Sequence, residues 1–266
     1  MTMWLFAYFV LGMFSGFCAG LFGVGGGVVL VPILTSLFVA QQFPHEHVLH
    51  LALGSSMATI VFTSISSLRA HHLRGAVRWP IVLKIAPGIV IGTLLGSQLA
   101  SQVPTRPLGI FFAAFITCVA IQMFLNVKPQ PHRQLPSAMG IAGVGIVIGA
   151  VSALVAIGGG SLSVPFMTWC NVKVQHAIGT SAAIGLPIAL SGAVGYAISG
   201  WSQTGMPPGS LGYLYLPAVA GTALASVMTA PLGAGVTHSL QPATVQKIFA
   251  AILLLLVAKM LHTLFF

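Results

Sequence analysis

The chain has 266 residues, of which 57% are hydrophobic and only 4% are charged, too few to give a soluble fold a water-facing surface. The composition therefore predicts an integral, multi-pass protein of the cell inner membrane, with lipid around it. Ten lysines and arginines stand against one acid, Glu46, but they lie in short loops where they set membrane orientation, which excludes nucleic acid as a partner.

Apolar runs of about 20 residues or more predict eight membrane segments. In chain order they are 4–40, 48–70, 79–101, 107–125, 137–170, 176–200, 211–235 and 243–265. The first and the fifth are the longest, and glycines interrupt both. The polar, proline-rich stretch 127–136 is predicted to be a linker outside the bilayer, between a first repeat, 1–126, and a second, 137–266.

The two halves repeat each other around the interruptions. Residues 20–27 are Gly-Leu-Phe-Gly-Val-Gly-Gly-Gly, and residues 153–160 are Ala-Leu-Val-Ala-Ile-Gly-Gly-Gly. The match continues at a constant offset of 133 residues (158 − 25 = 133) through Val-Pro at 31–32 and 164–165. A constant offset over so many glycines and prolines indicates an internal duplication, in which each copy holds one broken segment and three whole ones.

The broken segments admit two geometries. If each is a re-entrant hairpin that returns to its own side, the halves are inverted relative to each other; if each crosses once, the repeats are parallel. The hairpin gives the larger excess of basic residues on the cytoplasmic side, and the basic loop 70–78 corresponds to an uncharged loop, 200–210. The predicted fold is therefore all-α, with two inverted repeats, each a glycine-broken re-entrant hairpin plus three transmembrane helices, and both chain ends outside the cytoplasm.

A helix break at membrane depth must be buried in protein or must line a polar cavity. The half-helices that begin near Val28 and Ser161 would direct free N–H groups and the positive ends of their dipoles toward the breaks. Two such ends near the midplane predict an anion site. The alternative is that the triplets only allow close helix packing, as expected for the glycine rows 12/16/20 and 88/92/96.

A second duplicated element, 51–56 and 176–181, ends in the hydroxyl pairs Ser55-Ser56 and Thr180-Ser181. These hydroxyls are expected to donate to an anion or to cap a helix, and His176 is the histidine most readily connected with a proton or the substrate. A third, weaker match, 92–93 with 221–222, favours packing. The predicted substrate-binding residues are Gly25, Gly26, Gly27, Ser55, Ser56, Gly158, Gly159, Gly160, Ser161, His176, Thr180 and Ser181.

Several kinds of function lack the residues they need. No aspartate or glutamate lies in any predicted segment, which excludes the usual cation sites and carboxylate proton relays. No catalytic set is present, so the chain is not expected to be an enzyme. Neither a cofactor nor a metal is expected, because the histidines at 45, 47 and 50 are best interpreted as an interfacial loop.

The motifs at 20–32, 157–165 and 176–181 resemble those of the sulfite exporter TauE/SafE family, and the resemblance covers essentially the whole chain. It implies export of anionic sulfur compounds, sulfite or organosulfonates such as sulfoacetate. The working mechanism is alternating access, in which two halves rock around a midplane site. An anion channel and a carrier for another small anion remain alternatives, and the glycine row 88/92/96 permits a homodimer.

Overall fold

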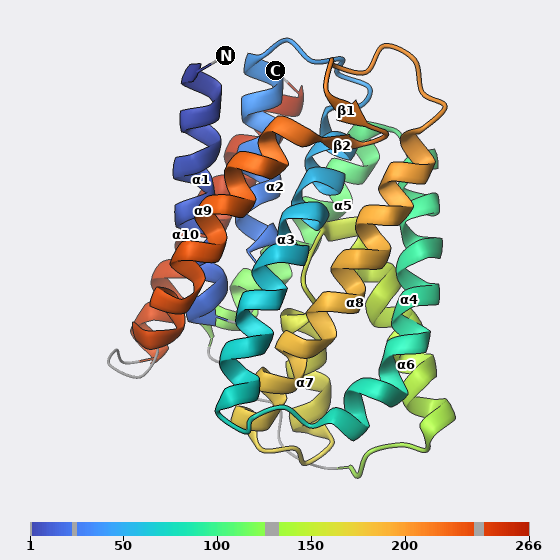
Figure 1. The fold of residues 1–266 in the computed structure, drawn as a ribbon, viewed down its shortest axis with the longest axis vertical. Coiled ribbons are helices and arrows are strands. Elements are labelled where there is room, and N and C mark those ends of the chain that lie inside the picture. The colour runs from blue at the N-terminus through green and yellow to red at the C-terminus, as the bar shows by residue number, and fades with distance from the viewer. Residues whose placement is uncertain (1, 23–25, 126–132, 237–241, 266) are drawn as a thin grey trace.

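The computed structural model describes residues 2–22, 26–125, 133–236 and 242–265, which form an elongated bundle of helices (Figure 1). Eight of the described helices are long and apolar enough to cross a membrane, whereas α2 and α7, with 14 and 10 residues, are too short. The helices are α1 (Thr2–Phe22), α2 (Gly27–Ala40), α3 (Val48–Leu73), α4 (Trp79–Gln102), α5 (Thr105–Phe124), α6 (Ala138–Val155), α7 (Gly160–Trp169), α8 (Val174–Gly200), α9 (Leu216–Val236) and α10 (Pro242–Phe265). The chain is a multi-pass, helical membrane protein, as the sequence predicts.

A short ribbon precedes α9, in part of the sequence that was predicted to be helical from residue 211. Strands β1 (Ser210–Leu211) and β2 (Leu214–Tyr215) pair antiparallel, and α9 begins only after them. Gly212 makes the turn with φ of 57°, and a Cβ at this position would lie 2.1 Å from the carbonyl oxygen of Ala197. A tight turn against α8 therefore replaces the first helical turn that hydropathy predicted.

Each short helix lies beside the helix before it and runs back toward the same end of the bundle. Gln41, just after α2, donates from Nε2 to the hydroxyl of Tyr8 on α1 over 2.6 Å. At α7, the N–H of Arg133, ahead of α6, donates to the carbonyl oxygen of Trp169 over 3.2 Å. In Figure 1 the α1–α2 pair opens toward the top, with both chain termini, and the α6–α7 pair opens toward the bottom.

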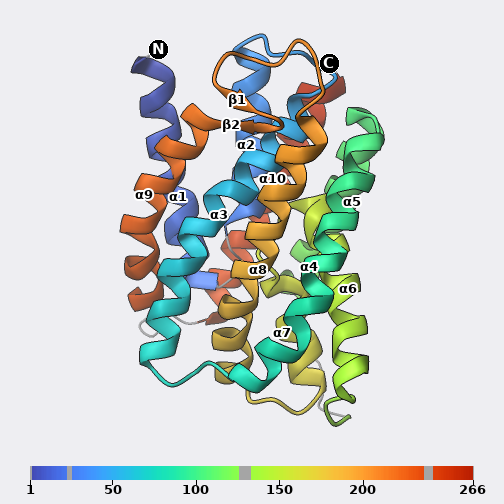
Figure 2. The ribbon, with the colours of Figure 1, turned by 45° about the vertical axis from the view of Figure 1, so that its right-hand side comes forward.

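The first helix of each pair, α1 or α6, packs along a helix from the other half of the sequence. Helix α1 lies against α9, and α6 lies against α4, as the two views in Figures 1 and 2 agree. The contacts depend on glycine: a Cβ at Gly12 would lie 2.4 Å from the carbonyl oxygen of Thr222, and one at Gly92 would lie 2.0 Å from that of Ile146. Helix packing within one chain uses these glycine rows, so they offer no free surface to a second copy.

Candidate substrate site

The two helix breaks have the same local geometry. Gly26 precedes α2 with φ of 77°, and Gly159 precedes α7 with φ of 84°, in the left-handed region that glycine adopts without strain. Neither residue provides a side-chain cap. The first N–H groups of α2 and α7 therefore lack the partner that a serine or aspartate cap would supply, although the N–H groups of Val29 and Leu162 donate to the carbonyl oxygens of Gly26 and Gly159.

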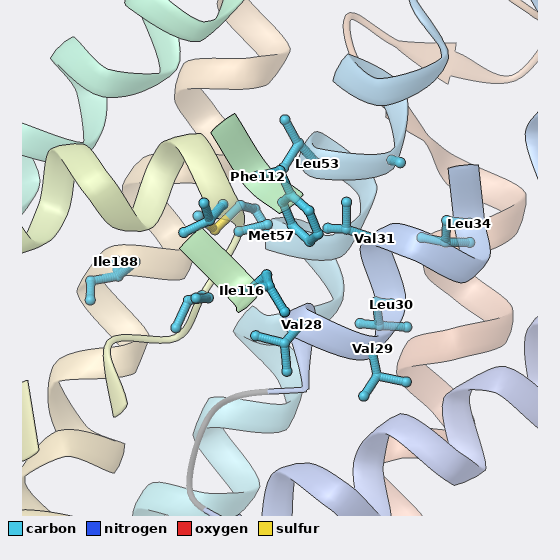
Figure 3. Packing of buried hydrophobic residues seen from close by; sticks show 14 of the residues in the cluster. Val28, Val29, Leu30, Val31, Leu34, Leu53, Met57, Phe112, Ile116 and Ile188 are labelled. Carbon is cyan, nitrogen blue, oxygen red and sulfur yellow. The ribbon is translucent and has the colours of Figure 1, made fainter. Parts of the chain in front are cut away.

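The breaks contact each other in the middle of the bundle. A Cβ added at Gly27 would lie only 1.7 Å from the carbonyl oxygen of Ala156, so the backbone that starts α2 lies directly on the end of α6. Gly25 lies outside the described residues. Figure 3 shows the start of α2 at Val28, which belongs with Met57 of α3 and Ile116 of α5 to one buried apolar cluster.

A small cavity, with room for about one water molecule, lies beside both breaks. Its lining residues come from α1, α3 and α8 and from the second break: Ala19, Thr63, Ser64, Ser67, Gly158, Ala182 and Gly185. Ala19 is only 3.3 Å from the Cβ position at Gly26, and Gly158 directly precedes Gly159. The residue ahead of each half-helix therefore lies at the edge of the cavity.

The cavity is lined by hydroxyl groups and small side chains. Ser64 is only 6% exposed, and no hydrogen bond joins its hydroxyl to any residue in the described part of the chain. Thr63 bonds to Ser226 of α9 over 3.0 Å. Of the predicted site residues, only Gly158 lines the cavity, whereas the hydroxyls of Thr63, Ser64 and Ser67 were missed. The four-residue spacing of Ser55, Thr59, Thr63 and Ser67 along one face of α3 was the signal that could have found them.

The first member of each predicted hydroxyl pair is engaged in holding another helix. Ser55 Oγ accepts a hydrogen bond from the N–H of Tyr215, directly before α9, over 2.9 Å. Thr180 Oγ1 accepts one from the N–H of Arg78, directly before α4, over 3.0 Å. Nδ1 of His176 lies 3.2 Å from the carbonyl oxygen of Ala76 in the same loop. These three side chains therefore hold the residues that lead into α9 and α4. This agrees with the alternative in which the hydroxyls cap a helix, except that the helix is a neighbouring one.

The second member of each pair has a buried hydroxyl without a partner. Ser56 and Ser181 are both 0% exposed, and neither Oγ has a hydrogen-bond partner among the residues described; the same holds for the buried Oγ of Ser161 at the start of α7. Ser181 is one helical turn from Gly185, which contacts the carbonyl oxygen of Gly158. Unpaired hydroxyls cost stability when buried, and Thr93, Ser152 and Ser210 have buried hydroxyls in the same state.

The electrostatics of the cavity come from dipoles. Its described lining contains no ionisable side chain. The lysines within the helices α4 and α10, which are Lys84, Lys247 and Lys259, are exposed on the outside of the bundle. A bound anion would therefore meet the positive ends of α2 and α7 and neutral hydroxyl donors.

The motifs that form the breaks identify the family. A family model described as Sulfite exporter TauE/SafE matches residues 8–260, which include both breaks and the whole cavity lining. The chain belongs to this family. All the lining residues of the cavity therefore lie in the part of the chain that matches the TauE/SafE family.

Relatives of this TauE/SafE protein occur in bacteria and archaea. A protein of Haemophilus influenzae named "Probable membrane transporter protein" is 37% identical over 253 residues, covering 94% of this chain and 96% of the relative. "Probable membrane transporter protein YunE" of Bacillus subtilis is 27% identical, with 95% and 96% covered. A similarly named protein of Methanocaldococcus jannaschii is 22% identical, with 92% and 90% covered. No solved structure matches the chain at a significant level.

Proposed function

We propose that the protein is a secondary transporter, acting as an exporter, of sulfur-containing anions such as sulfite or organosulfonates. One observation carries the proposal: two uncapped half-helix N-termini lie at the edge of one cavity that has hydroxyl donors and no charged lining. Such ends bind oxyanions without a metal or a cofactor. The family and its relatives, all named as transporters, support transport over catalysis.

We propose further that the two halves are inverted repeats, each a re-entrant hairpin followed by three spanning helices, with the boundaries 1–126 and 137–266. The hydrogen bond from Tyr215 to Ser55 has its counterpart in the bond from Arg78 to Thr180, with the donor and acceptor halves exchanged. The acceptors are 125 residues apart (180 − 55), which is the offset of the second duplicated element (176 − 51), and the donors are 137 residues apart (215 − 78). The opposite directions of the two hairpins in Figure 1 support inversion.

In the proposed mechanism the halves alternate around the anion, which contacts N–H groups of the two triplets, Gly25–Gly27 and Gly158–Gly160. Ser56, Ser161 and Ser181 donate to its oxygens, while Ser55, Thr180 and His176 position the helices that surround it. The anion is exposed to one side of the membrane at a time, because the contact between Gly27 and Ala156 keeps the middle of the bundle closed.

The experiment that tests the proposal is flux of labelled sulfite into proteoliposomes, with unlabelled anion inside or outside. Saturable uptake that is stimulated by anion on the far side is expected, whereas a channel would show neither exchange nor stimulation. Gly159→Leu should abolish flux, because its backbone is left-handed and its Cβ would lie 2.6 Å from Ile188. Gly143→Leu is the matched control, since a Cβ there meets open space and the residue is exposed. Wild-type flux in Gly159→Leu would remove the second triplet from the site.

A further inference from the structure

The anion site is neutral over its whole described surface. Three hydroxyl residues line the cavity, and the remaining lining is alanine and glycine. The nearest histidine along α8 is His176, which is engaged with Ala76 and precedes the cavity residue Ala182 by more than one helical turn. No side chain in the described lining can therefore gain or lose charge to match a change in the charge of the ligand.

The positive potential that the site does offer has a defined size. The N-terminus of a helix is equivalent to about half an elementary charge. Helix α7 begins two residues after the lining residue Gly158, and Gly26, directly before α2, lies against the lining residue Ala19. The two ends sum to roughly one positive charge. Ser181 adds a second, independent indication of a ligand, because its hydroxyl is fully buried, has no hydrogen-bond partner among the residues described, and lies one helical turn from the lining residue Gly185.

A second negative charge on the ligand would be left uncompensated. The cost of moving an ion out of water rises with the square of its charge, so a dianion costs about four times as much as a monoanion of the same size. Hydroxyl and N–H donors offset this cost in part for both ions, but the dipoles match only the first charge. Selection by charge follows from the absence of a lysine or arginine in the cavity wall.

We infer that the site carries singly charged oxyanions: hydrogensulfite and monosulfonates are substrates, and the sulfite dianion and disulfonates are rejected. This inference rests on the proposed transport function and narrows its substrate class. It makes sulfoacetate, which has a carboxylate besides its sulfonate, a poorer substrate than a sulfonate with an uncharged tail.

The test compares three probes in the same proteoliposomes. Methanesulfonate is a monoanion and methanedisulfonate a dianion at every working pH, whereas hydrogensulfite loses its proton near neutrality. At fixed total sulfite, uptake is expected to fall by about tenfold for each pH unit above that ionisation, while methanesulfonate uptake stays constant. Methanedisulfonate uptake is expected to be at least about tenfold slower than methanesulfonate uptake.

Controls separate the protein from leak and from titration of its own groups. Empty liposomes and liposomes with Gly159→Leu give the leak, and constant methanesulfonate flux shows that no protein group causes the pH effect. Binding to the purified protein, measured by calorimetry with methanesulfonate and methanedisulfonate, gives a readout besides flux, and Ser64→Ala should weaken methanesulfonate binding.

The possible failures are distinguishable. Equal uptake or equal binding of the two sulfonates, or sulfite uptake that rises with the dianion fraction, would overturn the charge selection and leave anion transport standing. Absence of flux and binding for all three probes, in protein that unfolds at its normal temperature, would overturn the proposed function and this inference with it.

Discussion

Ser55 on α3 accepts a hydrogen bond from the backbone N–H of Tyr215, and this bond connects the first half of the chain to the start of α9 in the second. Its counterpart connects Thr180 on α8 to Arg78 at the start of α4. Gly54 and Gly179 allow both contacts, because a Cβ at either position would lie within 2.4 or 2.6 Å of the loop that each helix holds. The two central helices, α3 and α8, thus each position a helix of the opposite half.

Stability should distinguish the two neighbouring serines of α3. Ser55→Ala leaves the N–H of Tyr215 without its acceptor and should lower the free energy of unfolding by about 1–3 kcal/mol. Ser56→Ala is the matched control, since the Ser56 hydroxyl is equally buried but has no partner in the described structure. Thermal unfolding in detergent measures both. Equal melting temperatures for the two variants would contradict the assigned role of Ser55.

Transport should depend on the second hydroxyl residue of each pair, although stability does not. Ser56→Ala and Ser181→Ala remove hydroxyls that are proposed to donate to the anion, and each should weaken apparent affinity by about 10–150-fold, the value of one hydrogen bond to a charged group. Their melting temperatures should stay at or above the wild-type value, because a buried unpaired group is removed. Flux measured over a range of sulfite concentrations gives the affinity. An unchanged KM in both variants would assign these hydroxyls to packing alone.

The contact between the two breaks should tolerate no side chain. Gly27→Ala places a Cβ against the carbonyl oxygen of Ala156, so the two breaks must separate. We expect flux to fall by at least about tenfold and the melting temperature to fall as well, by a few degrees for each kcal/mol lost. Gly143→Ala, at an exposed position with open space, should behave as wild type. Full flux in Gly27→Ala would show that the breaks move independently.

Membrane orientation can be tested with single cysteines in a Cys118→Ala background, which removes the one exposed native cysteine of the described structure. Inverted repeats predict that Arg74→Cys and Lys173→Cys react with an impermeant maleimide from the cytoplasmic side, and Ser202→Cys from the opposite side. All three positions are exposed. Parallel repeats require the opposite result for positions 173 and 202, so labelling of Ser202→Cys from the cytoplasm would exclude inversion.

The sequence predicted the architecture best where backbone conformation demands one residue type. Glycine at 26 and 159 is required by a left-handed φ, and glycine at 88, 92 and 96 by the proximity of α6, so both kinds of position stand out in the chain. The membrane segments followed from hydropathy in the same direct way. The prediction from hydropathy was wrong at the start of α9, because the turn at Gly212 moves the first helical residue from 211 to 216.

The site was harder to predict because it depends on which face of a helix meets which neighbour. Gly145 is the repeat of Gly12. Gly12 contacts Thr222 and Gly145 contacts Ile85, so by packing the residue equivalent to Thr222 is Ile85. The match of 92–93 with 221–222 is therefore wrong as a structural equivalence. For the same reason, the duplicated hydroxyl motif did not predict that Ser55 and Thr180 face loops and that Ser64 faces the cavity.

The exchange of partners between halves has a consequence for biosynthesis. Helix α1 leaves the ribosome well before α9, on which it mainly packs, because α9 follows it by about two hundred residues and five other described spanning helices. Until then its glycine face, at Gly12 and Gly16, lacks the helix that covers it in the folded protein. Helix α1 therefore depends on the insertion machinery, or on its own hydrophobicity, to stay in place, and a chain truncated before residue 216 would present this unpaired face to membrane quality control.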